Sequence, residues 1–348
     1  MPIKRSVRAV LLLALAALVA LTAACGDDGD DAAADTDGGE ASSSVDEGAF
    51  PVTIEHAFGA TEITEAPERV VTWGWGSTDA AIALGVVPVA IPFDDYAGDD
   101  EGVLPWVREA LDEMGAELPT ILPNQDEAPF EAIAAARPDM IMAAYSGITA
   151  EEYELLSAIA PVVAYPGEAW ATPWQELIEI VGTSLGRSDE AQDLLADIDA
   201  QVAEQAAAHP ELEGKTVAMV WDAAGTFYVY KAADPRVGWT LDLGLVSAES
   251  VDALATDEAT FYFTLSYEQL DQLTSDILVS FADTQEQADA FLASPQALLM
   301  DQVAEGRVAS VVGTEYIASV SPPTALSLTW GMDTFVDALS SAALAADG

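Results

Sequence analysis

Short apolar runs without polar interruption characterise the chain between residues 69 and 165. Four of them predict strands, over residues 69–72, 86–91, 140–143 and 161–165. Helix-like stretches separate these runs, over residues 79–84, 130–136 and 151–159. Because a strand that is buried on both faces reads as a continuous apolar run, the pattern predicts a parallel sheet with helices on its faces.

The run from 188 to 208 has a different pattern and predicts one long helix. It contains 21 residues without glycine or proline, and Pro210 ends it. Ser188 is placed to cap its first turn. Its narrow apolar stripe consists of Leu194, Leu195, Ile198 and Val202. A helix of this length spans roughly 32 Å, which is longer than a crossover within one sheet requires.

The alternation of strands and helices resumes after this helix, with strands predicted over residues 216–220, 277–281 and 308–312. We therefore expect an α/β protein of two lobes with mostly parallel central sheets, bridged by a single long α-helix, with a ligand cleft between the lobes. The expected bounds are 50–187 for the N-terminal lobe (N-lobe), 188–209 for the connecting helix and 210–348 for the C-terminal lobe (C-lobe). About 300 residues are enough for two such lobes.

The N-terminus has the pattern of an export signal. Lys4, Arg5 and Arg8 precede sixteen uncharged residues at 9–24. This run is shorter than the about 20 apolar residues that a spanning helix needs. Residues 1–24 are therefore interpreted as a signal peptide. The acidic segment 25–49 has almost no bulky apolar residue and is expected to be a disordered tether.

The only cysteine, Cys25, directly follows the small pair Ala23-Ala24. This arrangement resembles a bacterial lipobox, although Thr22 stands where an aliphatic residue is usual. The resemblance implies that Cys25 is acylated and anchors the protein on the extracytoplasmic face of the cell membrane. A lone exported cysteine also cannot form an internal disulfide. The alternative is an ordinary cleaved signal with an incidental cysteine.

The charge balance excludes one class of partner. The chain has 60 acidic residues against 11 lysines and arginines, a formal net charge of −49 at pH 7. Loss of the signal peptide removes three basic residues and leaves eight, so the mature charge is −52. Such a surface repels nucleic acid. It suits salty solution, where screening relieves its self-repulsion.

The residues with catalytic or metal-binding chemistry favour a binding protein over an enzyme. The only histidines, His56 and His209, are far apart in the sequence, whereas capture of zinc or manganese recruits several imidazoles. We therefore expect no cofactor and no metal bound directly by the protein. No nucleophile elbow, P-loop or HExxH motif is present. An exported hydrolase remains the alternative from another class, and it would need a paired acid and base in the cleft.

Large aromatic residues recur just after the predicted strands, where ligands bind in open parallel sheets. The candidates in the N-lobe are Trp73, Trp75, Tyr145 and Trp170. In the C-lobe, Trp221 and Tyr316 follow predicted strands and Phe281 ends one. Three further candidates lie in the loop of residues 230–239, namely Lys231, Arg236 and Trp239. The strongest four are Trp73, Trp75, Tyr145 and Arg236. The alternative for each aromatic residue is a core or loop-anchoring role.

Several segments, taken in order, resemble one family. The N-lobe carries PERVVTWGWGSTDAAIALGVVPVAIP, EAIAAARPDMIMAAYSG and YELLSAIAPVVAY, and the C-lobe LSYEQLDQLTSDILVSF and SPPTALSLTWGMDTFVDAL. With the long helix between them, these resemble the substrate-binding proteins of ABC importers for ferric siderophores, haem and cobalamin, and most of all the iron-siderophore branch. The resemblance implies a monomeric protein that captures a ferric siderophore and delivers it to a permease without chemistry. A haem or corrinoid ligand is the alternative within the family.

The resemblance also implies one permease-docking glutamate in each lobe. The matching positions are Glu131, in EAIAAARPD, and Glu268, in SYEQL. Each lies in the first turn of a predicted helix, where a carboxylate is favoured by about 0.3–1 kcal/mol in any case. Ser266 and Gln269 have the spacing of a capping box.

The few basic residues predict the charge of the ligand. In the mature chain they are Arg69, Arg108, Arg137, Arg187, Arg236, Arg307, Lys215 and Lys231. The basic residues that precede strands or lie at helix ends should face away from the cleft. Lys231 and Arg236 then remain as the expected cations in the cleft. Because an unpaired buried anion is costly, we expect a neutral or cationic complex, a ferric hydroxamate of the ferrioxamine type first. Arg236 would donate to hydroxamate oxygens, while Trp73, Trp75 and Tyr145 cover the apolar chelator backbone.

Overall fold

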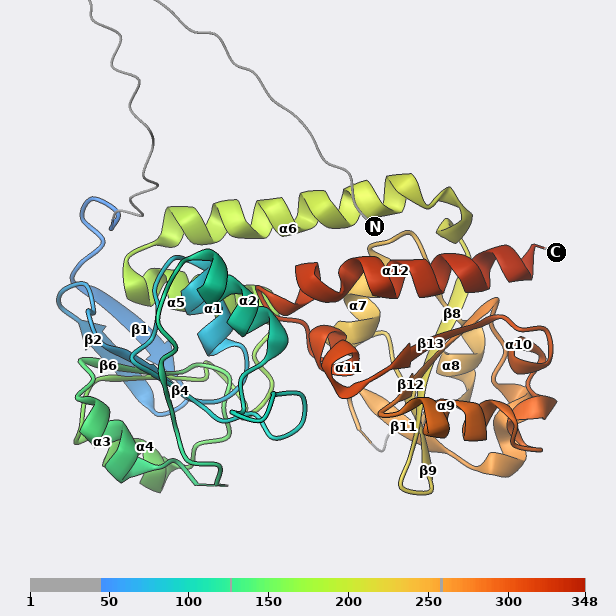
Figure 1. Cartoon of the computed structure of the whole chain (residues 1–348), viewed down its shortest axis with the longest axis horizontal. Helices are drawn as coiled ribbons and strands as arrows, with labels where there is room; N and C mark the ends of the chain where they lie inside the picture. Colours follow the sequence, from blue (N-terminus) through green and yellow to red (C-terminus); the bar gives the residue numbers. More distant parts are fainter. Residues whose placement is uncertain (1–44, 126, 257–258, 348) are drawn as a thin grey trace, which may run out of the picture. The chain divides into compact units, whose positions relative to one another are not determined.

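Two sheets, one in each lobe, organise the part of the chain that the computed structural model describes, residues 45–125, 127–256 and 259–347 (Figure 1). The predictions for the signal peptide, for Cys25 and for most of the tether concern residues outside this part. Within these described residues, no helix is both long enough and apolar enough to cross a membrane.

The N-lobe sheet is entirely parallel, as the apolar runs predicted. Its order is β5-β4-β3-β6-β7. The strands are β3 (Val70–Thr72), β4 (Ala90–Ile91), β5 (Thr120–Ile121), β6 (Met140–Ala143) and β7 (Val162–Ala164). The strand expected over 86–91 is confined to its last two residues. Every residue of β6 is buried, which explains its uninterrupted apolar run.

Helices and one hairpin complete the N-lobe. The helices are α1 (Ser77–Ala83), α2 (Pro105–Glu113), α3 (Phe130–Ala136), α4 (Ala150–Ser157) and α5 (Trp174–Leu185). The antiparallel hairpin consists of β1 (Val52–His56) and β2 (Gly59–Ile63). Gly85 follows α1 with a φ of 77°, as expected of a glycine after a helix end.

The C-lobe sheet is mixed, with the order β11-β9-β8-β12-β13 and β10 beside the start of β8. Its strands are β8 (Thr216–Ala223), β9 (Thr226–Tyr230), β10 (Val246–Ser247), β11 (Tyr262–Leu265), β12 (Ile277–Ala282) and β13 (Val308–Val312). The three predicted strands, β8, β12 and β13, are parallel. The antiparallel β9 and β11 were not predicted; they extend the sheet beyond β8.

The C-lobe helices lie mostly between these strands. They are α7 (Pro235–Leu241), α8 (Glu249–Leu254), α9 (Gln285–Leu292), α10 (Asp301–Ala304), α11 (Thr314–Val320) and α12 (Ser327–Ala346). Short 3₁₀ turns are η1 (Pro210–Leu212), η2 (Tyr267–Gln272) and η3 (Ala297–Leu299).

The connecting helix α6 spans Ser188–Ala208, as predicted, and runs from the N-lobe to the C-lobe along one side of both (Figure 1). The prediction that Ser188 caps it was wrong, because Ser188 is its first helical residue and Arg187 occupies the cap position. The carboxylate of Asp46 accepts hydrogen bonds from the backbone N–H groups of Ser188 (2.7 Å) and Asp189 (3.3 Å) instead. A segment distant in sequence, from within the predicted tether, therefore caps this helix.

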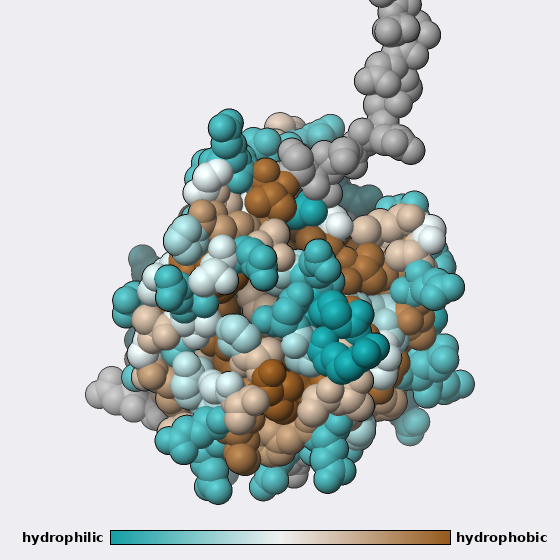
Figure 2. Space-filling view, turned by 90° about the vertical axis from the view of Figure 1, so that its left-hand side faces the viewer, coloured by the Kyte–Doolittle hydropathy of each residue, from teal (hydrophilic) through white to brown (hydrophobic). Residues whose placement is uncertain are grey.

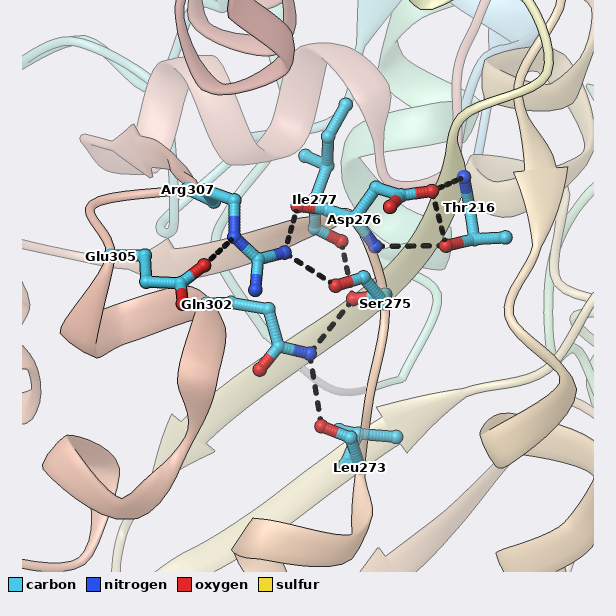
Figure 3. Close-up of polar contacts among 8 residues, drawn as sticks. All are labelled: Thr216, Leu273, Ser275, Asp276, Ile277, Gln302, Glu305 and Arg307. Atoms are coloured by element: carbon cyan, nitrogen blue, oxygen red, sulfur yellow. Dashed lines mark hydrogen bonds and ion pairs between the residues drawn. The ribbon is translucent and has the colours of Figure 1, made fainter. Parts of the chain in front are cut away.

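Aspartate carboxylates that accept hydrogen bonds from backbone N–H groups also fix the start of the central strands in both lobes. The carboxylate of Asp139, just before β6, accepts from the backbone N–H groups of Glu68 (2.8 Å) and Arg69 (2.9 Å), just before β3. In the C-lobe, the carboxylate of Asp276, just before β12, accepts from Thr216 N–H and Oγ1–H, both at 2.8 Å (Figure 3). Each aspartate thus joins the start of one central strand to the start of its parallel neighbour.

Arginine side chains reinforce this edge. Arg307 Nη1 donates to the carbonyls of Ser275 (2.7 Å) and Asp276 (2.6 Å), beside the Gln302 amide that donates to Leu273 O (2.9 Å) (Figure 3). In the N-lobe, the Arg69 guanidinium likewise donates to the carbonyls of Ala136 and Arg137, at the end of α3. As expected, these two arginines are engaged at the edge where strands begin.

We expect Asp276→Ala to lower the free energy of unfolding by about 2 kcal/mol, because it leaves two donors of Thr216 without their acceptor. Urea unfolding at pH 7 measures this change. The Thr216 hydrogen bonds lower the pKa of Asp276 from 3.8. The contribution of the carboxylate is therefore present above pH 3.8 and is lost as the pH falls through the lowered pKa.

The control is Asp271→Ala, which removes an exposed carboxylate from η2 and should change stability by no more than about 0.5 kcal/mol. Equal losses for the two variants would contradict a specific role of Asp276.

Candidate functional site

Two cavities open where the strands of the N-lobe sheet end. The first, which we name the N-lobe cavity, has a volume of about 380 Å³. Its largest lining side chains are Trp73, Trp75, Phe93, Leu104, Ile148 and Trp170. Trp73 and Phe93 follow β3 and β4 within two residues. Because the strands are parallel, their carboxyl ends bring these side chains to one edge.

The second, which we name the interlobe cavity, has a volume of about 450 Å³ and is lined by both lobes. The N-lobe contributes Tyr145, Trp170 and the start of α5, and the C-lobe contributes α7 and Pro322. Since Trp170 lines both cavities, they meet at its side chain. Together they form the candidate cleft.

Trp170 stands between the cavities in an uncommon conformation. It has a φ of 59° and is 56% exposed, although it is a large apolar residue. Its ring meets the edge of Tyr145 at 6.1 Å between centroids. A Cβ on Gly147 would lie 2.1 Å from Trp170 Nε1, so this close approach requires glycine at 147. An exposed tryptophan held in this way offers a ring face to a ligand.

Arg236 brings a cation to the interlobe cavity, but its charge is mostly compensated. Its Nε donates to Asp234 Oδ1 at 2.7 Å, and its guanidinium lies 3.8 Å from the centroid of the Tyr230 ring. Asp234 also caps α7 through the backbone N–H of Arg236. Burial raises the pKa of Asp234, and Arg236 opposes that shift. Arg236 Nη1 is buried without a hydrogen-bond partner among the described residues, so this donor is unsatisfied.

Tyrosines surround this guanidinium. Burial raises the pKa of Tyr145 and of Tyr230, so both hydroxyls stay protonated. Tyr96, in the loop after β4, donates its hydroxyl to Asp283 Oδ1 at 2.8 Å across the lobes. Burial and this hydrogen bond raise the pKa of Tyr96 well above its usual value. The geometry favours a ligand with oxygen acceptors and apolar surface.

Sequence reasoning missed Tyr96, Asp283 and Tyr230. Asp283 directly follows β12, so the rule that selected residues after strands could have found it. Tyr230 ends the antiparallel strand β9, which the sequence did not reveal.

Six of the ten ligand-binding candidates line the cleft. The N-lobe cavity has Trp73, Trp75 and Trp170, and the interlobe cavity has Tyr145, Trp170, Arg236 and Trp239. Trp239 is only 3% exposed and packs against Phe335, with its Nε1 unpartnered among the described residues.

The other four candidates lie elsewhere. Trp221 lies inside β8 rather than after it, because that strand extends to Ala223. Phe281 lies in β12, one residue before its end, and lines neither cavity. Lys231 Nζ donates to the carbonyls of Thr256 and Ala259, both at 2.7 Å. Tyr316 stacks on Trp330 and lines a separate cavity of about 290 Å³ in the C-lobe.

The two expected docking glutamates are exposed. Glu131 lies in the first turn of α3, at the N-lobe end of the molecule, and Glu268 lies on η2. Figure 2 looks onto that N-lobe end and shows hydrophilic residues over much of its surface, with small hydrophobic patches between them. The predicted capping box was wrong, because Ser266 Oγ accepts from Glu268 N–H in a tighter 3₁₀ turn.

Neither histidine is placed to bind a ligand in the cleft. His56 is 7% exposed, and its Nε2 lies 3.0 Å from Thr61 Oγ1. His209 pairs with Glu211 at the end of α6. The described part of the chain contains no group of three or more His, Cys, Asp or Glu side chains that could hold a metal ion.

A buried carboxylate joins the lobes at the floor of the cleft. Asp79, in the first turn of α1, is 1% exposed and lines the N-lobe cavity. It accepts from Trp106 Nε1 at 2.6 Å and from Thr324, which lies between α11 and α12. Beside it, Trp75 Nε1 donates to Pro322 O at 3.1 Å. Burial raises the pKa of Asp79 to about 6.

Comparisons with known proteins give consistent matches. A family model described as periplasmic binding protein matches residues 70–312. The Fe(3+) dicitrate-binding periplasmic protein FecB of Escherichia coli K12 is 30% identical over 165 residues, which cover 47% of this chain and only about half, 52%, of FecB. The ferric enterobactin-binding periplasmic protein FepB of Escherichia coli O6:H1 is 26% identical over 283 residues, 76% of this chain and 85% of FepB.

Solved structures agree over a longer range. The iron-uptake substrate-binding protein PiaA of Streptococcus pneumoniae TIGR4, solved in complex with ferrichrome, is 33% identical to this chain, with a TM-score of 0.74. That similarity covers 84% of this chain and 99% of PiaA.

The raised pKa predicts how Asp79 couples stability to pH. The ordinary pKa of this aspartate is 3.8, and the folded protein raises it to about 6. Between pH 6 and pH 3.8, Asp79 of the folded protein therefore binds a proton that the unfolded chain does not bind, so acidification favours the folded state. Asp79→Asn keeps an oxygen acceptor for Trp106 but removes this proton. From pH 7 to pH 4, the unfolding free energy of the wild type should therefore rise by on the order of 3 kcal/mol relative to that of Asp79→Asn.

Urea unfolding at intervals from pH 7 to pH 4 measures this difference. Asp112→Asn, at an exposed position on α2, controls for the loss of one negative charge. Parallel curves for wild type and Asp79→Asn would show that Asp79 does not take up the proton.

Proposed function

Because the chain belongs to the family of periplasmic binding proteins, we propose that it binds a ferric siderophore outside the cytoplasm and delivers it to the permease of an ABC importer. The observation that carries this proposal is the cleft between the lobes, where Trp170, Tyr145 and Arg236 meet. The ferrichrome complex of PiaA, the curated relatives that bind ferric dicitrate and ferric enterobactin, and the match over most of the chain support it.

The charge in the cleft favours a ferric hydroxamate over an anionic chelate. Arg236 is the only lysine or arginine among the described residues that line the two cavities, and Asp234 already pairs with it. Asp242 adds a further carboxylate to the interlobe cavity. A ferric tris-catecholate would bring several negative charges into this environment, whereas a neutral or cationic hydroxamate complex avoids that cost.

Each cleft residue has a role in this proposal. Arg236 Nη1 donates to a hydroxamate oxygen, and Tyr145 adds a hydroxyl group. The rings of Trp75 and Trp170 cover the apolar chelator backbone. The iron enters as part of the cargo, so the protein supplies no metal ligand, and the chelate leaves chemically unchanged.

We further propose that a lipid on Cys25 anchors the protein to the cell membrane and that segment 25–44 links the anchor to the folded part. The monomer docks on the permease through Glu131 and Glu268, which are exposed on different lobes. Two separated contacts allow the permease to sense the distance between the lobes.

Titration of tryptophan fluorescence with ferrichrome and with ferric enterobactin tests the ligand class. We expect tighter binding of ferrichrome at matched ionic strength, and tighter binding of ferric enterobactin would overturn the charge argument. Arg236→Ala should weaken ferrichrome binding roughly tenfold or more, because it removes a hydrogen bond from a charged donor. Lys231→Ala, in which the lost cation binds backbone carbonyls, is the matched control and should change affinity little.

The docking proposal predicts that Glu131→Ala combined with Glu268→Ala abolishes uptake and leaves ligand affinity intact, because both carboxylates are exposed and line neither cavity. Uptake of radioactive iron by cells that express each variant measures import. Glu151→Ala with Glu286→Ala removes two exposed charges from α4 and α9 as a control. A double variant that imports at the wild-type rate would refute docking through these residues.

A further inference from the structure

The N-lobe cavity has a chemistry of its own. Four aromatic side chains, Trp73, Trp75, Phe93 and Trp170, line its volume of about 380 Å³. Trp73, Trp75 and Phe93 are half-buried, which fixes their rings, while Trp170 is more than half exposed. Aromatic faces carry partial negative charge and attract cations as well as apolar groups.

The charged residues of this cavity are all acidic. Asp79, Asp94 and Glu152 line it, and no lysine, arginine or histidine does so among the described residues. The interlobe cavity differs, since Arg236 lies there beside Asp234. The N-lobe cavity is therefore the more electronegative part of the cleft, and it disfavours an anionic group.

These carboxylates are held in place by the protein, which argues against a chelated metal. Asp94 Oδ1 accepts from the backbone N–H groups of Tyr96 (3.1 Å), Ala97 (2.7 Å) and Gly98 (3.2 Å). Glu152 accepts from the backbone N–H groups of Thr149 and Ala128. Fixed negative charges beside aromatic faces suit an organic cation, which needs attraction from several sides and no close coordination.

The cavity also adjoins the proposed chelate site. Trp170 lines both cavities and touches Tyr145, which lies on the interlobe side. A chelate held beside Arg236 could therefore extend an arm past Trp170. The volume lies within the range of small-molecule sites, so an alkyl arm ending in an ammonium group fits.

We propose that the N-lobe cavity holds a cationic alkylammonium arm of the ligand, between the rings of Trp73, Trp75 and Trp170. This inference rests on the proposed function and narrows it, from ferric hydroxamates in general to those that carry a protonated amine outside the iron-binding groups. The amine lies near carboxylates, whereas the chelate lies near Arg236.

Two ferric chelates that differ only at this amine test the inference. Ferrioxamine B, which has a free terminal amine, is compared with its N-acetylated derivative, which has the same hydroxamates and no charge on the arm. In a fluorescence titration the acetylated complex should bind roughly tenfold more weakly. Equal or tighter binding of the acetylated complex would overturn the inference and indicate an apolar arm, while the proposed function would stand. Failure of both complexes and of ferrichrome to bind would instead refute the proposed function and the inference with it.

A variant locates the effect. Asp94→Asn with Glu152→Gln keeps an oxygen acceptor at each position but removes two charges from the cavity. The affinity ratio of the two chelates should then fall from about ten to roughly three, because Asp79 and the tryptophan rings remain. Glu154→Gln, at an exposed position of α4 outside both cavities, should leave the ratio unchanged. A ratio that stays the same in the double variant would place the amine elsewhere and overturn the inference.

Discussion

The hydrogen bond that Thr324 donates to the buried carboxylate of Asp79 holds the two lobes in register, and the cleft depends on it. Trp106 donates to the same carboxylate from within the N-lobe. A carboxylate that is 1% exposed is costly unless donors satisfy it, so the segment between α11 and α12 must stay docked on α1. That docking places Pro322 at the wall of the interlobe cavity and binds Trp75 to it. A shift of this segment relative to α1 would therefore move cavity-lining groups of both lobes at once.

The two edges of each sheet serve different purposes. At the edge where strands begin, Asp139 and Asp276 tie central strands together through short hydrogen bonds to backbone groups. At the opposite edge the parallel strands end in loops that carry Trp73, Tyr145 and Asp283. Because the structural hydrogen bonds are concentrated at one edge, the loops at the other are free to line a cleft.

Electrostatics act at two ranges on the ligand. The net charge of −49 attracts cations from a distance and repels anions, less strongly in salt. Within the cleft, Arg236 offers directed donors while Asp234 compensates most of its charge. The interlobe cavity thereby offers hydrogen-bond donors with little net positive charge.

Local patterns were enough to predict the bounds of the buried strand at 140–143 and of the helices at 130–136 and 188–208. A strand buried on both faces has a continuous apolar run, and a helix lacks glycine and proline, so both signals lie in neighbouring residues. The alternation of strands and helices on either side of the long helix led to the two-lobe fold, and the rule that ligands bind after parallel strands led to Trp73 and Tyr145. Contacts between segments that are distant in the sequence are not contained in any local pattern. Asp46 caps a helix 142 residues away, and Tyr96 reaches Asp283 across 187 residues. Trp221 fell inside its strand because strand length depends on pairing with neighbours. Such features are decided only when the folded chain brings donors, acceptors and strand partners together.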